Sequence, residues 1–226
     1  DGLKQSIVQG TVVPVLVAAA TANTGVRSLL DTIVGLGPSP LELGPAVAEG
    51  PAGEEQIESS ELAPLATLVF KTAADPFVGK MTYFRVFGGM VPSNGTVFNS
   101  RAGVEERLGQ LFTMRGKEQI MVERVRAGDI AVAAKLSVTA TGDTLCDKSH
   151  PVKLPGISFP SPLYSVAVMP TSKADQAKLG PTLSRICEED PTLHWHQEPS
   201  TQQTILQGMG DTHVEIAVRR MENRFD

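Results

Sequence analysis

Histidine and acidic side chains near the C-terminus are the residues whose types suggest metal or acid–base chemistry. His194 and His196 are two apart in an expected strand, so both side chains point to one face of it. A metal site needs a third ligand, but His213 and Glu198 lie at no zinc-type spacing from this pair. A half-buried surface pair explains the two histidines better, and we predict no metal site.

The remaining reactive residue types form no catalytic group either. Asp211 and Glu215 flank His213, but acids at the start of a helix are explained by its electrostatics, and no nucleophile can be placed beside them. Cys146 and Cys187 have no metal-like spacing and are expected to be small core residues. Neither G-x-x-x-x-G-K-[ST] nor G-x-G-x-x-G occurs, so Gly208-Met-Gly210 is interpreted as a turn. We predict no catalytic residue in this chain.

Basic residues are concentrated in one part of an acidic chain. The net charge is −5, yet Lys80–Arg126 carries eight basic and four acidic residues. Such an excess is typical of a phosphate-facing surface. The alternative is an ordinary solvated exterior, which charge alone favours.

The N-terminal segment has the pattern of one strand and one helix. The apolar run from Gly10 to Ala20 predicts a strand buried on both faces, and Val26–Val34 predicts a helix. One such pair cannot bury both of its faces, so residues 1–37 are expected to be the last part of an α/β domain cut from a longer protein. Residues 38–61, rich in proline, glycine and glutamate, predict an extended linker.

Residues 62–147 consist of short β-type runs between turn signals, with no helical stretch. This pattern predicts an antiparallel β-barrel. The expected strands are Thr67–Thr72, Met81–Phe87, Thr96–Asn99, Arg107–Met114, Ile120–Val125, Ile130–Lys135 and Thr144–Cys146.

The C-terminal third predicts a ferredoxin-like α+β sandwich. Residues 148–156 contain Pro151, Pro155 and Gly156 and are expected to be an extended hinge with few buried contacts. Residues 157–226 then give the order β-α-β-β-α, one strand short of the complete unit. The expected elements are Leu163–Met169, Ser172–Glu189, Leu193–Gln197, Gln203–Gln207 and a helix lined by Val214, Ala217, Val218, Met221 and Phe225. The fold class is therefore multi-domain, β plus α/β.

The longest apolar stretch, Val12–Ala20, is about half the length of a membrane span and contains Pro14. No signal peptide precedes it, and two widely separated cysteines suit a reducing compartment. We therefore expect a cytoplasmic protein.

Several strings of residues resemble the elongation factor G family of translational GTPases. Residues 62–147 resemble its domain II through Leu68-Val-Phe-Lys-Thr72, Asp75-Pro-Phe-Val-Gly-Lys80, Ala127-Gly-Asp-Ile130 and Thr141-Gly-Asp-Thr-Leu-Cys-Asp147. Residues 157–226 resemble its domain III through Lys173-Ala-Asp-Gln176, Glu188-Glu-Asp-Pro-Thr192 and Gly208-Met-Gly210 followed by His213. The opening is similar to the end of the GTPase domain. Departures at Ala18–Ala20, Thr201–Thr204 and Gly210–His213 suggest a divergent copy.

The resemblance implies a ribosome-binding protein that couples GTP state to movement of tRNA and mRNA, with no membrane or DNA partner. GTP and magnesium would be cofactors of the longer protein, and this chain would keep only Ala19 and Ala20 of the guanine-contacting loop. The basic side chains implied to face ribosomal RNA are Lys80, Arg85, Arg101, Arg107, Arg115 and Lys117. The family's fusidic acid cleft would be lined by Pro162, Asp190, Thr192 and His213.

Two alternatives stay open at this point. Ribosomal protection proteins and peptide-chain release factor three share the barrel and domain III, although the Thr-Leu-Cys-Asp and Gly-Met-Gly strings favour elongation factor G. A barrel binding module that is not a GTPase is the second alternative. The strand and helix expected at residues 11–34 argue against it.

Overall fold

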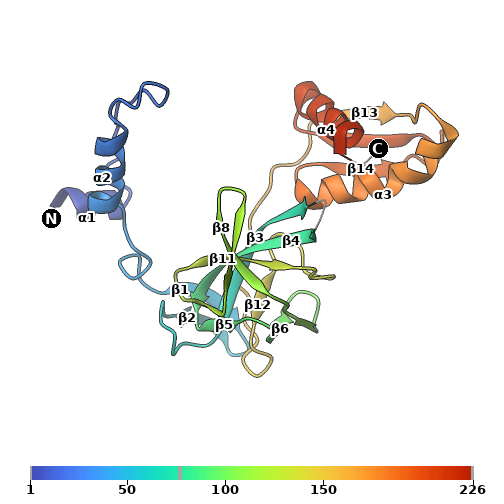
Figure 1. The fold of residues 1–226 in the computed structure, drawn as a ribbon. Helices are drawn as coiled ribbons and strands as arrows, with labels where there is room; N and C mark the ends of the chain where they lie inside the picture. The colour runs from blue at the N-terminus through green and yellow to red at the C-terminus, as the bar shows by residue number, and fades with distance from the viewer. Residues whose placement is uncertain (1, 76–77, 225–226) are drawn as a thin grey trace.

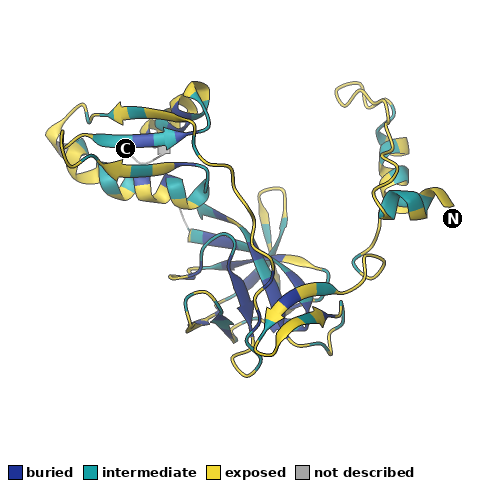
Figure 2. Ribbon diagram, turned by 180° about the vertical axis from the view of Figure 1, so that it is seen from behind, coloured by how far each residue is buried: buried dark blue, intermediate teal, exposed yellow. Residues whose placement is uncertain are grey.

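The computed structural model describes residues 2–75 and 78–224 and shows three parts along the chain. Two N-terminal helices stand away from a central β-barrel, and a small α/β domain follows the barrel (Figure 1). Burial follows the same division, because the buried residues lie in the barrel and the α/β domain while the N-terminal part is largely exposed (Figure 2).

The predicted strand at residues 10–20 is absent from the structure. The N-terminal helices are α1 (Gly2–Val8) and α2 (Val26–Leu36), and residues 12–18 between them have no regular structure. Val13, Val15 and Val17 are 80%, 90% and 94% exposed. Among the described residues no strand lies beside this segment, and a β-strand needs a hydrogen-bonded neighbour to form. The helix prediction is confirmed.

The segment predicted to be a linker contains a β-hairpin. Strands β1 (Ala46–Gly50) and β2 (Gly53–Ile57) pair antiparallel, and Ala48 and Ile57 are 2% and 1% exposed. They pack in a small core with Ala66 and Cys146 of the barrel. An extended linker was therefore the wrong prediction for residues 46–57, because the hairpin docks through buried side chains and through backbone hydrogen bonds between Glu49 and Lys153.

The predicted antiparallel barrel is confirmed. Its main sheet has eight strands in the order β7-β6-β12-β3-β4-β11-β8-β9. Their bounds are β3 (Ala66–Asp75), β4 (Gly79–Gly88), β6 (Thr96–Asn99), β7 (Val104–Arg107), β8 (Leu111–Arg115), β9 (Glu118–Val122), β11 (Ile130–Ala134) and β12 (Thr144–Cys146). A second, two-stranded sheet pairs β5 (Met90–Pro92) with β10 (Arg124–Arg126). All seven predicted runs contain strands, although the run at 107–114 is divided between β7 and β8 and the run at 120–125 between β9 and β10.

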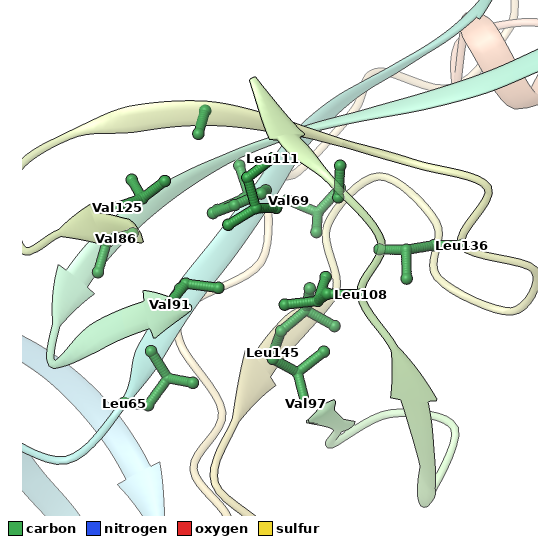
Figure 3. Packing of buried hydrophobic residues seen from close by; sticks show 13 residues of the cluster. Leu65, Val69, Val86, Val91, Val97, Leu108, Leu111, Val125, Leu136 and Leu145 are labelled. Atoms are coloured by element: carbon green, nitrogen blue, oxygen red, sulfur yellow. The ribbon is translucent and has the colours of Figure 1, made fainter. Parts of the chain in front are cut away.

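Aliphatic side chains fill the barrel from all sides (Figure 3). Val69, Val86, Leu108, Leu111 and Leu145 point toward one another and are at most 2% exposed. Val69 and Val86 alternate with more exposed neighbours along β3 and β4, as in a half-buried strand, whereas all three residues of β12 are buried. Burial of such side chains is the main stabilising term for a domain with few aromatic residues.

Two buried carboxylates hold the long loop between β11 and β12. Glu106 accepts hydrogen bonds from the backbone amides of Ser137, Val138 and Thr139 at 2.7, 2.9 and 3.0 Å and from the Thr139 hydroxyl. Asp143 accepts from Asn99 Nδ2 at 2.9 Å and is paired with Arg101. The loop therefore closes one end of the barrel through charge-assisted hydrogen bonds.

The α/β domain has the predicted β-α-β-β-α order. Its elements are β13 (Tyr164–Val168), α3 (Lys173–Glu189), β14 (His194–Gln197), β15 (Thr204–Gly208) and α4 (Asp211–Arg224), with sheet order β13-β15-β14. Ser172 caps α3 by accepting a hydrogen bond from the amide of Asp175. The core contains Leu183, Leu206 and Val214. Phe225, expected on α4, lies outside the described residues, and within those residues no strand pairs with the second edge of β13.

The expected hinge at residues 148–156 packs on the barrel instead. Val152 and Leu154 are 1% and 2% exposed and join the core under the hairpin. Lys153 exchanges two backbone hydrogen bonds of 2.8 Å with Glu49. The expectation that this segment makes few buried contacts was therefore wrong. Val152 and Leu154 are two residues apart in an extended segment, so both side chains point into the core. The exposed connection runs over residues 155–161.

The Glu106 network makes the barrel sensitive to acid. Burial alone would raise the pKa of Glu106, but hydrogen bonds from Thr139, Val138 and Ser137 lower it below its usual value. A lowered carboxyl pKa contributes stability above the unfolded-state value of about 4.3 and loses it as the pH falls toward the folded value. We expect Glu106→Gln to cost about 1–3 kcal/mol at pH 7, because an amide nitrogen would then face backbone donors.

The free energy of unfolding of the barrel, measured by urea titration with amide hydrogen exchange as the probe, tests this expectation between pH 7 and about pH 3. Glu106→Gln should flatten the acid-induced loss of stability. The control is Glu105→Gln, at the exposed neighbouring position that pairs with Lys148. Equal acid sensitivity of the two variants would contradict the role of Glu106.

Candidate functional site

The C-terminal end of α3 joins the barrel to the rest of the α/β domain. Three consecutive acids, Glu188, Glu189 and Asp190, form this end, which we call the acidic junction. Negative charge is unfavourable at a helix C-terminus, where the helix dipole is itself negative, and the last turn contains no basic residue. The junction therefore depends on partners outside its own helix.

Glu188 and Glu189 contact the β3–β4 hairpin of the barrel. The buried Thr72 hydroxyl donates to the carbonyl oxygen of Glu188 at 2.5 Å, and Lys80 Nζ forms an ion pair with the Glu188 carboxylate. The Ala74 amide donates to the carboxylate of Glu189. Figure 1 shows α3 beside this end of the hairpin. These contacts fix the two domains to each other at one point.

Asp190 faces the other way, toward the start of α4. Its carboxylate accepts from the Thr192 amide at 3.0 Å and hydroxyl at 2.5 Å, and its second oxygen lies 3.0 Å from His213 Nε2. The Met209 amide donates to His213 Nδ1 at 3.1 Å. Because Nδ1 accepts, Nε2 carries a proton and donates to Asp190, so both ring nitrogens are hydrogen-bonded.

Glycine at position 208 allows this approach. A Cβ atom there would lie 2.9 Å from Val214 Cγ2 and 3.1 Å from both His213 Nδ1 and Leu193 Cδ2. A side chain at this position would therefore displace these neighbours, so glycine favours the approach of His213 to Asp190. The Gly208-Met-Gly210 string is thus a packing turn, as predicted.

Hydrogen bonding outweighs burial at Asp190. Burial alone would raise the pKa of this carboxyl, but hydrogen bonds from Thr192 and His213 lower it below its usual range. Burial raises the pKa of the nearby Cys187 thiol to about 11, so this cysteine is an unreactive thiol at neutral pH. The network around Asp190 therefore connects the end of α3 to the start of α4, and the described side chains of this network include no activated nucleophile.

The structure brings together the four residues implied for the drug cleft. Asp190, Thr192 and His213 share the network described above. Pro162 lies at the same end of the domain, because the next residue, Leu163, donates its amide to the carbonyl of Gly208 at 2.9 Å. Ala19 and Ala20 lie far from this site along the chain, in an exposed turn that Ala19 closes through two hydrogen bonds with Thr24.

The basic residues expected to face RNA divide into two groups. Lys80 pairs with Glu188, Arg101 with the buried Asp143, and the Arg85 guanidinium stacks 4.8 Å from the centre of the Phe87 ring with its Nε buried. These three side chains therefore have partners within the fold, although the Arg101 side chain is still 55% exposed. Arg107 and Lys117 are exposed, and Arg115 is exposed and pairs with Glu118.

The residues of the metal hypothesis do not converge. His194 and His196 lie on β14 with exposed side chains, and the described residues contain no group of three metal-ligating side chains. Within the same residues, no helix has the length and apolar character that crossing a membrane requires.

Sequence reasoning missed the contacts of Glu188 and Glu189 with the barrel. Glu189 was expected to end a helix, and both residues appeared in a string of the family resemblance. A physical signal was present, since three acids at the end of a helix require compensation from elsewhere. The partners, Thr72, Ala74 and Lys80, are more than 100 positions away, and no local pattern identifies them.

Replacing His213 should destabilise the α/β domain. His213→Ala leaves the Met209 amide and one oxygen of Asp190 without a partner, which should cost about 1–3 kcal/mol. Trp195 is the single tryptophan and lies in this domain, so its fluorescence during urea titration measures the change. His194→Ala, at an exposed position, is the control. A cost no larger than that of the control would contradict the network.

Comparison with known proteins agrees with this architecture. Residues 64–148 match the family model described as elongation factor G domain 2, and residues 159–226 match that of elongation factor G domain III. A crystal structure of a protein from Thermus thermophilus superposes on 97% of this chain with a TM-score of 0.79 and 28% sequence identity. This chain spans 31% of that protein. The chain therefore contains domains II and III of a protein of the elongation factor G family.

Proposed function

We propose that this chain is the middle part of an elongation factor G-like GTPase that binds the ribosome and couples its GTP state to movement of tRNA and mRNA. The observation that carries the proposal is the presence of two consecutive family domains, in order, fastened to each other at the acidic junction. Two domains joined by a small contact suit a relay between conformational states. We place this function in the cytoplasm.

The chemistry of GTP hydrolysis belongs to the longer protein in this proposal. The sequence contains no phosphate-binding loop, and the residues that remain of the implied guanine loop, Ala19 and Ala20, bring no charged or hydroxyl group. GTP and magnesium are therefore proposed as cofactors of the parent protein. Domains II and III contribute binding and positioning.

Exposed basic side chains of the barrel are proposed to contact ribosomal RNA. Arg107, Lys117 and Arg124 are exposed and have no ion-pair partner within the described residues. Phosphate contacts release bound counterions, so affinity for the ribosome should fall steeply with salt. Replacing the three side chains with glutamine should weaken binding and reduce the salt dependence, by about one unit of slope for each phosphate that is no longer neutralised.

Co-sedimentation with ribosomes at several salt concentrations measures this effect. The control replaces Lys4, Arg27 and Lys173, three basic residues outside the barrel, with glutamine. Binding that is indifferent to salt, or equally weak for both triple variants, would contradict the proposed surface.

The relay also requires that the interdomain contact can break. Lys80 is 19% exposed and Glu188 is 40% exposed, so salt screens their ion pair only in part. Lys80→Ala should weaken the attachment of α3 to the barrel, which the Thr72 and Ala74 hydrogen bonds still support, and broaden the distribution of domain orientations. Small-angle scattering should show a larger mean radius for this variant, and exchange of the Ala74 amide should accelerate.

Arg115→Ala provides the matched control for that experiment. It removes another ion pair of the barrel, with Glu118, that joins neighbouring strands instead of two domains. Identical scattering of Lys80→Ala and wild type would mean that Lys80 does not hold the domains together.

A further inference from the structure

A pocket opens on the α/β domain at the end of its sheet opposite the acidic junction. Its volume is about 400 Å³, within the range of about 300–1,000 Å³ typical of small-molecule sites. The walls come from α3, the end of β13, strand β14 and the start of β15. None of the residues described above as part of the acidic junction lines it.

Trp195 forms an aromatic wall of this pocket, and its ring is held in place. The indole Nε1 donates to Ser184 Oγ at 3.3 Å. The ring also lies close to Gly180, where an added Cβ would be 3.6 Å from Cη2 of the indole. Gly180 and Ser184 are one turn apart on α3, so the ring is fixed along the helix and needs little ordering before it binds a ligand.

The polar groups of the pocket are neutral amides and a hydroxyl. Gln176, Gln197, Gln202, Gln203 and Thr204 line it, and no lining residue is charged. Gln203 Oε1 accepts from Thr201, which leaves its Nε2 free to donate. Within the described residues the side chains of Gln176 and Thr204 have no hydrogen-bond partner. Side-chain amides can donate and accept at once, as the edge of a nucleobase also does.

We propose that this pocket binds an unpaired nucleobase, stacked on Trp195 and hydrogen-bonded by Gln176 and Gln203. The ligand is flat and neutral at the point of contact, because the pocket has an aromatic wall and no cation to hold a phosphate. Proteins hold unpaired bases in this way, with aromatic stacking and hydrogen bonds to the base edges. The base belongs either to a single strand of RNA or to a free nucleoside. The site goes beyond the proposed function, which needs no base-binding pocket.

Fluorescence of the single tryptophan tests the proposal directly. We expect a single-stranded RNA of about ten nucleotides to quench Trp195 emission saturably, while the same sequence as a duplex, whose bases are paired, should not. Gln176→Ala with Gln203→Ala should weaken the apparent affinity at least fivefold, equivalent to about 1 kcal/mol for one hydrogen bond. Gln207→Ala, on the same strand as Thr204 but outside the pocket, is the matched control.

Anisotropy of labelled RNA gives a second measurement for variants that lack the reporter. Trp195→Ala should weaken binding by roughly 5- to 150-fold, from the 1–3 kcal/mol of one stacked base. Trp195→Phe, which keeps an aromatic ring, should recover most of this affinity. His196→Ala removes an exposed aromatic side chain from the same strand and should change nothing.

Adenosine and uridine distinguish the two sources of the base. If nucleosides quench as well as the oligonucleotide at equal base concentration, the ligand is a free nucleoside and the pocket assignment stands. The pocket assignment would be overturned if neither the RNA nor the nucleosides quenched Trp195. It would also be overturned if quenching were unchanged in the variant that carries Gln176→Ala and Gln203→Ala. Quenching by uncharged nucleosides should not depend on salt. A negative result for the pocket can therefore be distinguished from a negative result for ribosome binding, which should depend on salt.

Discussion

The barrel depends on two carboxylates that are buried and fully hydrogen-bonded. A buried charge without partners is very costly, so Glu106 and Asp143 are tolerated only because backbone amides, hydroxyls and Arg101 surround them. In return they fix the loop between β11 and β12, together with Leu136, a loop residue that is 2% exposed in the barrel core. Removing either carboxylate leaves several donors without an acceptor. The ionised carboxylates therefore help to hold this loop on the barrel.

A rigid barrel is what allows the acidic junction to form. Strands β3 and β4 are both ten residues long and carry Thr72, Ala74 and Lys80 beyond the barrel core to the end of α3. There they satisfy Glu188 and Glu189, whose charges oppose the helix dipole. The last turn of α3 is therefore stabilised in part by the other domain. A change in the contact between the domains therefore also changes the end of this helix.

Asp190 extends the same coupling into the second half of the α/β domain. It follows Glu189 directly and reaches α4 through His213, so one short acidic segment contacts both the barrel and the helix opposite. Such an arrangement is a physical basis for transmitting a shift of one domain to elements that do not touch the other. The Trp195 pocket lies at the opposite end of the sheet, where α3 begins.

Local patterns determined most of the elements. Alternation and turn residues predicted the barrel strands, and the Ser172 cap and apolar spacing predicted α3 and α4, because these signals depend on neighbours along the chain. Residues 10–20 were mistaken for a strand, since apolar character shows a need for burial but does not supply a pairing partner. Val152 and Leu154 were missed because prolines around them suggested a hinge. Only the tertiary structure decided which charges are structural: Arg101 meets Asp143, and Lys80 meets Glu188, across separations that no periodicity records. The electrostatic role of a side chain is set by what the fold places within a few ångströms of it, and that information is distributed over the whole chain.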